Sequence, residues 1–233
     1  MDDLLRKLEQ ANPALDLQSV NDDEFSFYGR LLTMYDAGEM LARASASLPD
    51  LPDAVVYEPS VAALEAPSML NTRIAQQIFG GLPVQVGWCY GRNVRMGALE
   101  FHKSSEVLVC LTDVILLVGI IDDIVISDTD PEICYDTSEV QAFLAPVGAV
   151  IEFHPWCLHF APIHARAGDG FATLVYLPKG TNEPLPFAPE PTGESQLLFG
   201  VNKWLIAHAD AQELIDEGAY VGILGPDIVV QPV

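Results

Sequence analysis

The stretch that decides the fold is Gly97–Gly119, GALEFHKSSEVLVCLTDVILLVG. It opens with the pattern of a short strand, in which successive side chains point to opposite faces, so Glu100 and His102 share one face. Glu106 extends this row if the strand stays regular. Beyond it the stretch is almost purely apolar and broken at Thr112–Asp113, which predicts two buried strands around a polar turn. A polar row inside an apolar shell is typical of a binding pocket.

Composition bounds the class of protein. The chain has 233 residues, half of them hydrophobic, which is enough for one domain with a sizeable core. The formal net charge of −22 argues against nucleic acid and against anionic membrane surfaces as partners. The N-terminus lacks a secretory pattern, and the longest apolar run, Val114–Ile121, is far shorter than the roughly 20 residues that span a bilayer. We therefore expect a soluble, cytoplasmic protein with reduced cysteines.

The order of patterns along the chain predicts a mainly β fold. Amphipathic or helix-forming segments occur at 2–11, 36–47 and about 67–79. From residue 82 onward, short β-branched or alternating segments follow one another without intervening helices, which favours an antiparallel sandwich or barrel. We expect a helical N-terminal arm and connector over 1–81 and a barrel with a C-terminal extension over 82–233, in one structural domain. The segment 122–139 is predicted to be a surface hairpin or loop, and 178–193 an exposed, extended connector.

The few cations gather near the polar row. Arg92, Arg95 and Lys103 surround the Glu-x-His pair, which predicts that they bind an anionic or polyhydroxy ligand there. The alternative is that they neutralise the neighbouring carboxylates. In the tail, Asn202 and Lys203 precede a tryptophan; we expect Asn202 to contact the ligand and Lys203 to close the pocket on a substrate oxyanion. A surface lysine with its stem on an aromatic ring is the alternative for that residue.

A second polar cluster lies downstream and carries a resemblance. Glu100-x-His102-x-x-x-Glu106 resembles the first cupin motif, with glutamate in place of its first histidine, and Pro146-x-Gly148 followed by a histidine resembles the second. The histidine comes later than in that motif, at His159. Longer phrases are similar to one bacterial cupin family, domain of unknown function 4867, over about Phe25–Ile228; they are LEFHKSSEV, TDVILLVG, CLHFAP, LPKGTN and NKWLIAH.

The resemblance implies a cupin jelly-roll barrel, with N-terminal helices and a C-terminal segment packed on it. It also implies a pocket like those of ureidoglycolate lyases and cupin sugar isomerases, although the family has no established activity. Carried onto this chain, the metal ligands are Glu100, His102, Glu106 and His159. Two imidazoles and two carboxylates suit a divalent zinc, manganese, iron or nickel ion.

Each ligand has an alternative. His102 could be a hydrogen-bonded core histidine, Glu100 could pair with a nearby cation, Glu106 would face outward if the strand bulges, and His154 could replace His159. A buried carboxylate needs an ion or a cation beside it in either case, because an unpaired one is costly to bury.

We expect a metal-dependent enzyme that isomerises or cleaves a small polar carbon compound. Glu106 and Lys203 are the predicted catalytic residues, since a positioned carboxylate can serve as a general base beside a Lewis-acidic ion. The alternatives are a non-catalytic small-molecule-binding cupin and a structural cupin with a vestigial site. A small polar or anionic molecule is the expected partner, and a homodimer is possible because it would cover a sheet edge.

Overall fold

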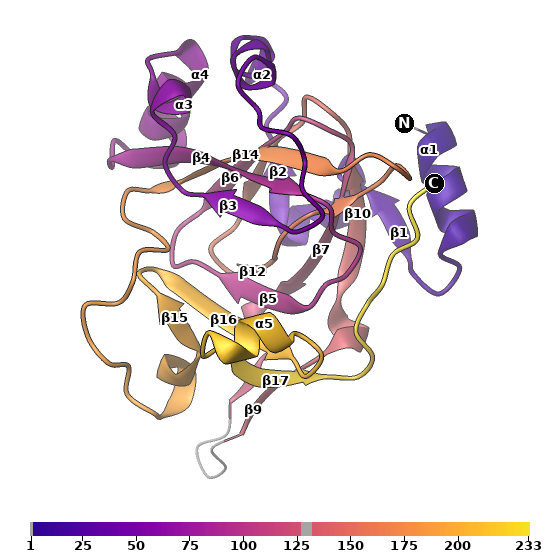
Figure 1. The fold of residues 1–233 in the computed structure, drawn as a ribbon, viewed down its shortest axis with the longest axis vertical. Coiled ribbons are helices and arrows are strands. Elements are labelled where there is room, and N and C mark those ends of the chain that lie inside the picture. Colours follow the sequence, from indigo (N-terminus) through magenta and orange to yellow (C-terminus); the bar gives the residue numbers. More distant parts are fainter. Residues whose placement is uncertain (1, 127–131) are drawn as a thin grey trace.

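The computed structural model describes residues 2–126 and 132–233 and confirms the mainly β fold. Its strands form three sheets (Figure 1). The first contains β1 (Leu17–Ser19), β10 (Gln141–Ala145), β7 (Val114–Ile120), β12 (Cys157–Leu158) and β13 (Ile163–His164). The second runs in the order β2 (Gly29–Leu31), β11 (Val150–Phe153), β6 (Glu106–Cys110), β14 (Phe171–Pro178), β4 (Val84–Gly91) and β3 (Val56–Glu58). The third joins β15 (Leu198–Gly200), β16 (Lys203–His208), β17 (Tyr220–Leu224), β9 (Ile133–Asp136), β8 (Val125–Ile126) and β5 (Ala98–Phe101).

The central strands form one long antiparallel hairpin that is rolled into a barrel. Val125 pairs with Cys134, Val118 with Gln141 and Val107 with Glu152. Further out, Glu100 forms an isolated antiparallel bridge with His159. For each residue that the pairing moves back along the segment from β8 to Glu100, it moves forward by one residue along the segment from β9 to His159. All these pairs therefore share one register. This nesting of β8–β9, β7–β10 and β6–β11 is the jelly-roll arrangement that the sequence predicted.

Successive side chains of a strand point to opposite faces of its sheet, and this divides the apolar core into layers. In β6, Leu108 and Cys110 face the interior of the barrel with Phe143 and Phe153, whereas Val107 and Val109 face the opposite side of the sheet. Glu106 has the parity of Leu108 and therefore faces the interior. A polar residue at this position of a buried strand needs a partner inside the barrel.

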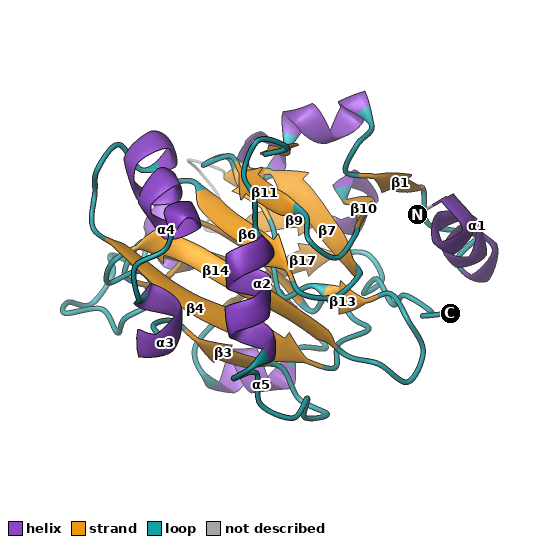
Figure 2. Ribbon diagram, turned by 90° about the horizontal axis from the view of Figure 1, so that it is seen from above, coloured by secondary structure: helices purple, strands orange, loops and turns teal. Residues whose placement is uncertain are grey.

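The outer face of the second sheet is covered by N-terminal helices. Figure 2 shows α2 (Gly38–Ser45), α3 (Ala62–Glu65) and α4 (Met69–Arg73) lying across β4, β6 and β14. A π-helical turn, Ile74–Ile78, continues α4. These elements bury an apolar cluster against the sheet; its members include Met40, Leu64, Leu70, Ile74, Trp88, Leu174 and Tyr176.

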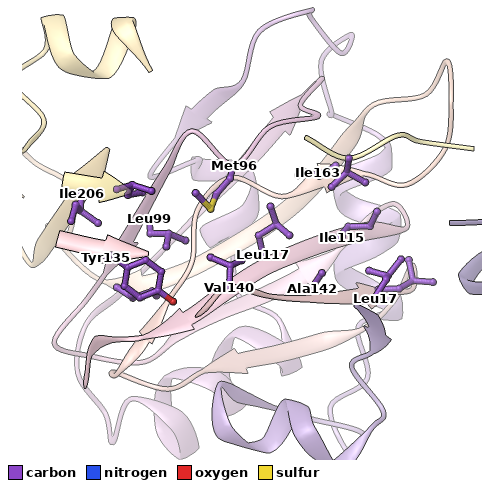
Figure 3. Packing of buried hydrophobic residues seen from close by; sticks show 14 of the residues in the cluster. Leu17, Met96, Leu99, Ile115, Leu117, Tyr135, Val140, Ala142, Ile163 and Ile206 are labelled. Carbon is purple, nitrogen blue, oxygen red and sulfur yellow. The ribbon is translucent and has the colours of Figure 1, made fainter. Parts of the chain in front are cut away.

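The two ends of the chain pack on the other side of the barrel. Helix α1 (Asp2–Ala11) lies beside the C-terminus, where the side chain of Asn12 hydrogen-bonds the backbone of Gln231 (Figure 1). The C-terminal elements β16, β17 and α5 (Gln212–Asp216) return to the middle of the chain, because β16 pairs with β5 and β17 with β9. Figure 3 shows the shared core between these segments, where Ile206 and Tyr135 approach Leu99 and Met96.

Several predicted elements match and some do not. The helix predicted over 2–11 is α1, and the other two predicted helices are shorter in the structure. Residues 1–81, predicted as a helical arm and connector, also contribute the strands β1, β2 and β3 to the sheets. The division of the chain at residue 81 stays a prediction. The segment 122–139, predicted as a hairpin or loop, contains the antiparallel β8–β9 pair, and residues 127–131 of it lie outside the described residues. None of the described helices is long and apolar enough to cross a bilayer.

Close approach of β3 to β4 depends on a glycine. A Cβ at Gly87 would lie 1.8 Å from the carbonyl oxygen of Glu58, which is backbone and cannot rotate away. We therefore expect Gly87→Ala to destabilise the protein by about 2 kcal/mol or more in urea unfolding. Gly38→Ala is the control, because its Cβ would meet only the flexible side chain of Asp36. Equal stability of the two variants would contradict this packing.

Candidate metal centre

Four side chains that the sequence predicted as ligands meet at one point. Each of Glu100, His102, Glu106 and His159 offers a donor atom, and these atoms lie within 4.8 Å of one another. Oε2 of Glu106 is 3.2 Å from Nε2 of His102 and 3.4 Å from Nε2 of His159. Oε1 of Glu100 is 3.8 Å from Nε2 of His102. The side chains of the two histidines and Glu106 are at most 8% exposed, and that of Glu100 is 12% exposed.

Backbone pairing holds two of these residues together. The amide of Glu100 donates to the carbonyl of His159 at 2.7 Å, and the amide of His159 donates back at 2.9 Å. Directly opposed residues of an antiparallel pair are close neighbours. The imidazole of His159 stacks on the ring of Phe153, with centroids 4.6 Å apart and an interplanar angle of 17°. The arrangement therefore follows from the register of the rolled hairpin.

Backbone carbonyls orient both imidazoles. Nδ1 of His102 lies 2.7 Å from the carbonyl oxygen of Asn202, and Nδ1 of His159 lies 3.2 Å from that of Cys157. A carbonyl only accepts, so each Nδ1 carries the hydrogen and each Nε2 is the atom turned to the carboxylates. Within the part of the chain that the structure describes, neither buried Nε2 makes a hydrogen bond of normal geometry.

These observations fit a divalent metal ion. Histidine ligands to a metal usually donate their other ring N–H to a carbonyl or carboxylate, as both histidines do here. Two buried Nε2 atoms that lack hydrogen-bond partners, beside two carboxylates, are the donors that such an ion would satisfy. The mixed nitrogen and oxygen set suits manganese, iron, nickel or zinc.

In the metal-free protein, Glu106 and His159 stabilise each other's charge. Burial is the largest single influence on Glu106 and raises its pKa, but the charges and contacts of His159 and His102 together outweigh burial and hold that pKa well below its usual range. Burial likewise lowers the pKa of His159, but Glu106 raises it well above the ordinary histidine value. An imidazolium–carboxylate pair therefore occupies the centre of the site before a metal enters.

Three of the four residues, Glu100, Glu106 and His159, border a cavity of about 120 Å³ inside the barrel. Its other walls are mostly apolar, with a few polar groups among them. The lining residues are Val55, Tyr57, Cys89, Glu100, Glu106, Leu108, His159, Phe160, Ala161, Pro162, Thr173, Val175, Asn182 and Lys203. Burial raises the pKa of the Tyr57 phenol and of the Cys89 thiol, so both groups are neutral at pH 7.

Lys203, which was predicted to be catalytic, lies in this cavity. Its Nζ is 2.5 Å from Oε2 of Glu100, and its side chain is only 16% exposed. The same ammonium lies 5.9 Å from the ring centroid of Phe160 and 5.7 Å from that of Phe199. The pairing of β16 with β5 sets this position, since Leu205 is the strand partner of Glu100. Lys203 is therefore not the surface lysine that the sequence left open as an alternative.

The structure does not bring the other predicted ligand-binding cations to the cavity. Arg92 pairs with Asp53 at 2.9 Å, and Arg95 pairs with Asp227 at 2.8 Å. Lys103 pairs with Glu194 and lies over the ring of Trp204. The side chains of all three are at least 41% exposed. These cations neutralise carboxylates that are distant in sequence, and not Glu100, Glu106 and their neighbours as the alternative expected.

Asn202, the fourth predicted ligand-binding residue, supports the site from outside the cavity. It has a left-handed backbone with φ of 54°, which asparagine tolerates better than most residues. Its side chain donates to the hydroxyls of Ser104 and Thr181 and accepts from the amide of Lys103. These bonds fix the carbonyl that accepts from His102.

The second Glu-Phe-His sequence is not a second ligand set. Glu152 pairs with Arg30 at 2.5 Å and accepts from Ser105 at 2.8 Å. The ring of His154 lies 4.6 Å from that of Trp156, and His154 is outside the cluster of donors. Its predicted role as a substitute for His159 is therefore not supported by its position.

Sequence reasoning missed Tyr57 and Asn182. Tyr57 comes from a segment predicted as a connector, and its hydroxyl accepts from the side chain of Asn182 at 3.0 Å. Asn182 has φ of 71°, and the only sequence signal for it is the turn phrase LPKGTN. No local pattern indicated that either residue would reach the cavity.

A family model described as "Domain of unknown function (DUF4867)" matches residues 17–228. The chain belongs to the DUF4867 family. This match confirms the predicted family, and the nested strand pairs of the barrel confirm the predicted jelly-roll fold of this DUF4867 protein. No curated protein matches the sequence.

Solved structures give partial alignments to this DUF4867 protein. Fe(II)-HppE with the alternative substrate (S)-1-HPP is 15% identical, with 56% of this chain and 52% of that chain covered and a TM-score of 0.29. Oxalate oxidase in complex with the substrate analogue glycolate is 13% identical, with 55% and 53% covered and a TM-score of 0.31. Bacillus subtilis oxalate decarboxylase is 8% identical, with 56% and 27% covered and a TM-score of 0.31. The chain thus spans about half the length of the first two. At these values the likeness says nothing of this chain's activity.

Replacing Asn202 should weaken metal binding without touching a ligand. Asn202→Ala removes three side-chain hydrogen bonds and strains the left-handed backbone, so we expect a loss of about 10- to 100-fold in zinc affinity. Asn202→Gly keeps the backbone conformation available and should lose less. A competition titration against a chromophoric chelator measures both, and unchanged affinity in Asn202→Ala would contradict the supporting role.

The Glu106–His159 pair should give the metal-free protein a distinct pH dependence. The raised pKa of His159 means that its contribution to stability is complete below about pH 6.5 and is lost as pH rises through the folded-state pKa. The depressed pKa of Glu106 sets the lower end of the pH range in which the pair stabilises the protein. The contribution of Glu106 to stability is complete above about pH 4.3 and is lost as pH falls through its folded-state pKa. In urea unfolding with EDTA from pH 5 to 9, the stability difference between wild type and His159→Gln should shrink as pH rises. A difference that grows with pH would be the opposite of this expectation.

Proposed function

We propose that this protein is a metal-dependent enzyme that acts on a small polar carbon compound in an isomerase-like or lyase-like reaction. The observation that carries the proposal is the set of four converging donors, two of them buried imidazole nitrogens without hydrogen-bond partners among the described residues, beside a partly open cavity that three of the four residues line. Glu100, His102, Glu106 and His159 would hold the ion. The predicted cytoplasmic location and the homodimer remain predictions.

The chemistry suits a substrate with an oxygen beside an acidic C–H. A bound divalent ion would polarise a carbonyl or hydroxyl oxygen as a Lewis acid. The protein supplies a small cavity with mostly apolar walls, in which charge interactions are stronger than in bulk water. Apolar residues such as Leu108, Pro162 and Val175 bound that cavity and restrict the size of the substrate.

The two carboxylates are suited to different roles. Glu106 lies between the two imidazoles, and its depressed pKa favours ligation over proton transfer. Glu100 lines the cavity and contacts the ammonium of Lys203, so as a ligand it also holds that ammonium beside the ion. Lys203 would then stabilise negative charge on a substrate oxygen. Glu106 contributes to catalysis in this scheme by holding the site together.

Metal analysis of matched variants tests the proposal. Purified wild type should contain a near-stoichiometric transition metal, and Glu106→Gln should retain less than a tenth of it, because the central donor becomes a neutral amide. Glu152→Gln is the control: this carboxylate is also buried and lies opposite Val107, but it binds Arg30 and Ser105 away from the cavity. The control should keep its metal.

Turnover separates the enzyme from a binding protein. A screen of sugars and hydroxy acids with the metal-loaded protein should show a conversion that Glu106→Gln abolishes and Glu152→Gln retains. Metal binding without any turnover would favour the non-catalytic cupin. If no transition metal binds and none raises the melting temperature, the proposed function is wrong.

A further inference from the structure

Building on the proposed function, we infer that the substrate of this site is a small monoanion, specifically a monocarboxylate, whose carboxylate is held by Lys203. The inference concerns the charge and size of the ligand, which the proposed function leaves open. It follows from the charges that line the cavity, the neutrality of its other walls and the placement of the remaining cations.

With a divalent ion bound, the ion and the side chains around it together carry a net charge of +1. Among the described residues that line the cavity, the acidic and basic side chains beside the thiol of Cys89 and the phenol of Tyr57 are the carboxylates of Glu100 and Glu106, the imidazole of His159 and the ammonium of Lys203. A histidine that binds a metal is neutral. Two carboxylates balance a divalent ion, so the charge of Lys203 is left over. A buried excess charge is costly, and a ligand with one negative charge removes the cost.

Lys203 is placed to make that contact. Its ammonium has three N–H donors, and the structure assigns it one carboxylate partner among the described residues, Glu100. Phe160 and Phe199 lie beside the same group and offer ring faces but no hydrogen-bond acceptor of ordinary strength. A ligand carboxylate in the cavity can accept hydrogen bonds from the remaining N–H groups of this ammonium.

More highly charged ligands are disfavoured. A phosphate ester carries about two negative charges at pH 7 and is normally matched by several cations. The candidates for that task, Arg92, Arg95 and Lys103, pair with carboxylates outside the cavity, namely Asp53, Asp227 and Glu194. A neutral sugar would leave the excess positive charge unmatched. The cavity of about 120 Å³ sets the size to a few carbons.

Paired ligands that differ only in charge test this inference. We would measure binding to the metal-loaded protein by calorimetry for hydroxy- and ketocarboxylates of two to five carbons, each against its own amide, such as lactate against lactamide. We expect at least one carboxylate to bind tenfold or more tightly than its amide. Phosphoglycolate and D-xylose should bind more weakly than that carboxylate.

Variants assign the preference to one side chain. Lys203→Met keeps an unbranched apolar stem between the rings but removes the charge, and it should reduce the carboxylate-to-amide ratio to near one. Lys203→Arg should keep most of the ratio. Lys103→Met is the matched control, since that lysine is paired with Glu194 outside the cavity, and its ratio should equal wild type. Circular dichroism and metal content establish that each variant is folded and loaded.

The failures of the two proposals are distinguishable. Absence of metal binding refutes the proposed function. A loaded protein whose amides, phosphate ester or sugar bind as well as every carboxylate, or which binds no carboxylate of the panel, refutes the monoanion inference while leaving the metal site intact. A preference that survives in Lys203→Met overturns the assignment to this lysine.

Discussion

The rest of the structure depends on one continuous antiparallel register. From the β8–β9 pair outward to the Glu100–His159 bridge, the two arms of the chain advance together without an inserted residue. A shift of one residue in this pairing would turn the interior side chains of β6 to the other face of the sheet. The apolar interior residues make such a shift costly. The same hydrophobic pattern that builds the barrel therefore also sets which polar groups meet inside it.

The C-terminal extension completes what the register begins. By pairing β16 with β5, it places the carbonyl of Asn202 against one imidazole and the ammonium of Lys203 against one carboxylate. The N-terminal region contributes in the same way through β3, which brings Tyr57 to the cavity. Segments from both ends of the chain thus surround donors that come from its middle. The site belongs to the whole domain rather than to the barrel alone.

Some of this could be predicted from the sequence because it depends on local periodicity. The two-residue spacing of Glu100 and His102 placed them on one face, and the apolar runs gave the strands. Glu106 meets them by a different route, since the strand breaks after Phe101 and Glu106 begins a strand of another sheet. Only the cupin resemblance indicated His159 as a ligand. Its position depends on pairing with Glu100, which lies 59 positions earlier in the sequence. The partners of Arg92, Arg95 and Lys103 are remote in sequence for the same reason, and strands of three residues such as β3 carry too short a pattern to detect.

The central claim is that two imidazoles and two carboxylates bind one divalent ion within the barrel. X-ray absorption at the edge of the metal that copurifies with the protein tests it most directly. The account predicts a shell of nitrogen and oxygen donors with the multiple-scattering signature of two imidazoles and no sulfur. A sulfur contribution from Cys89, the thiol that lines the cavity, or a shell without imidazole would contradict it.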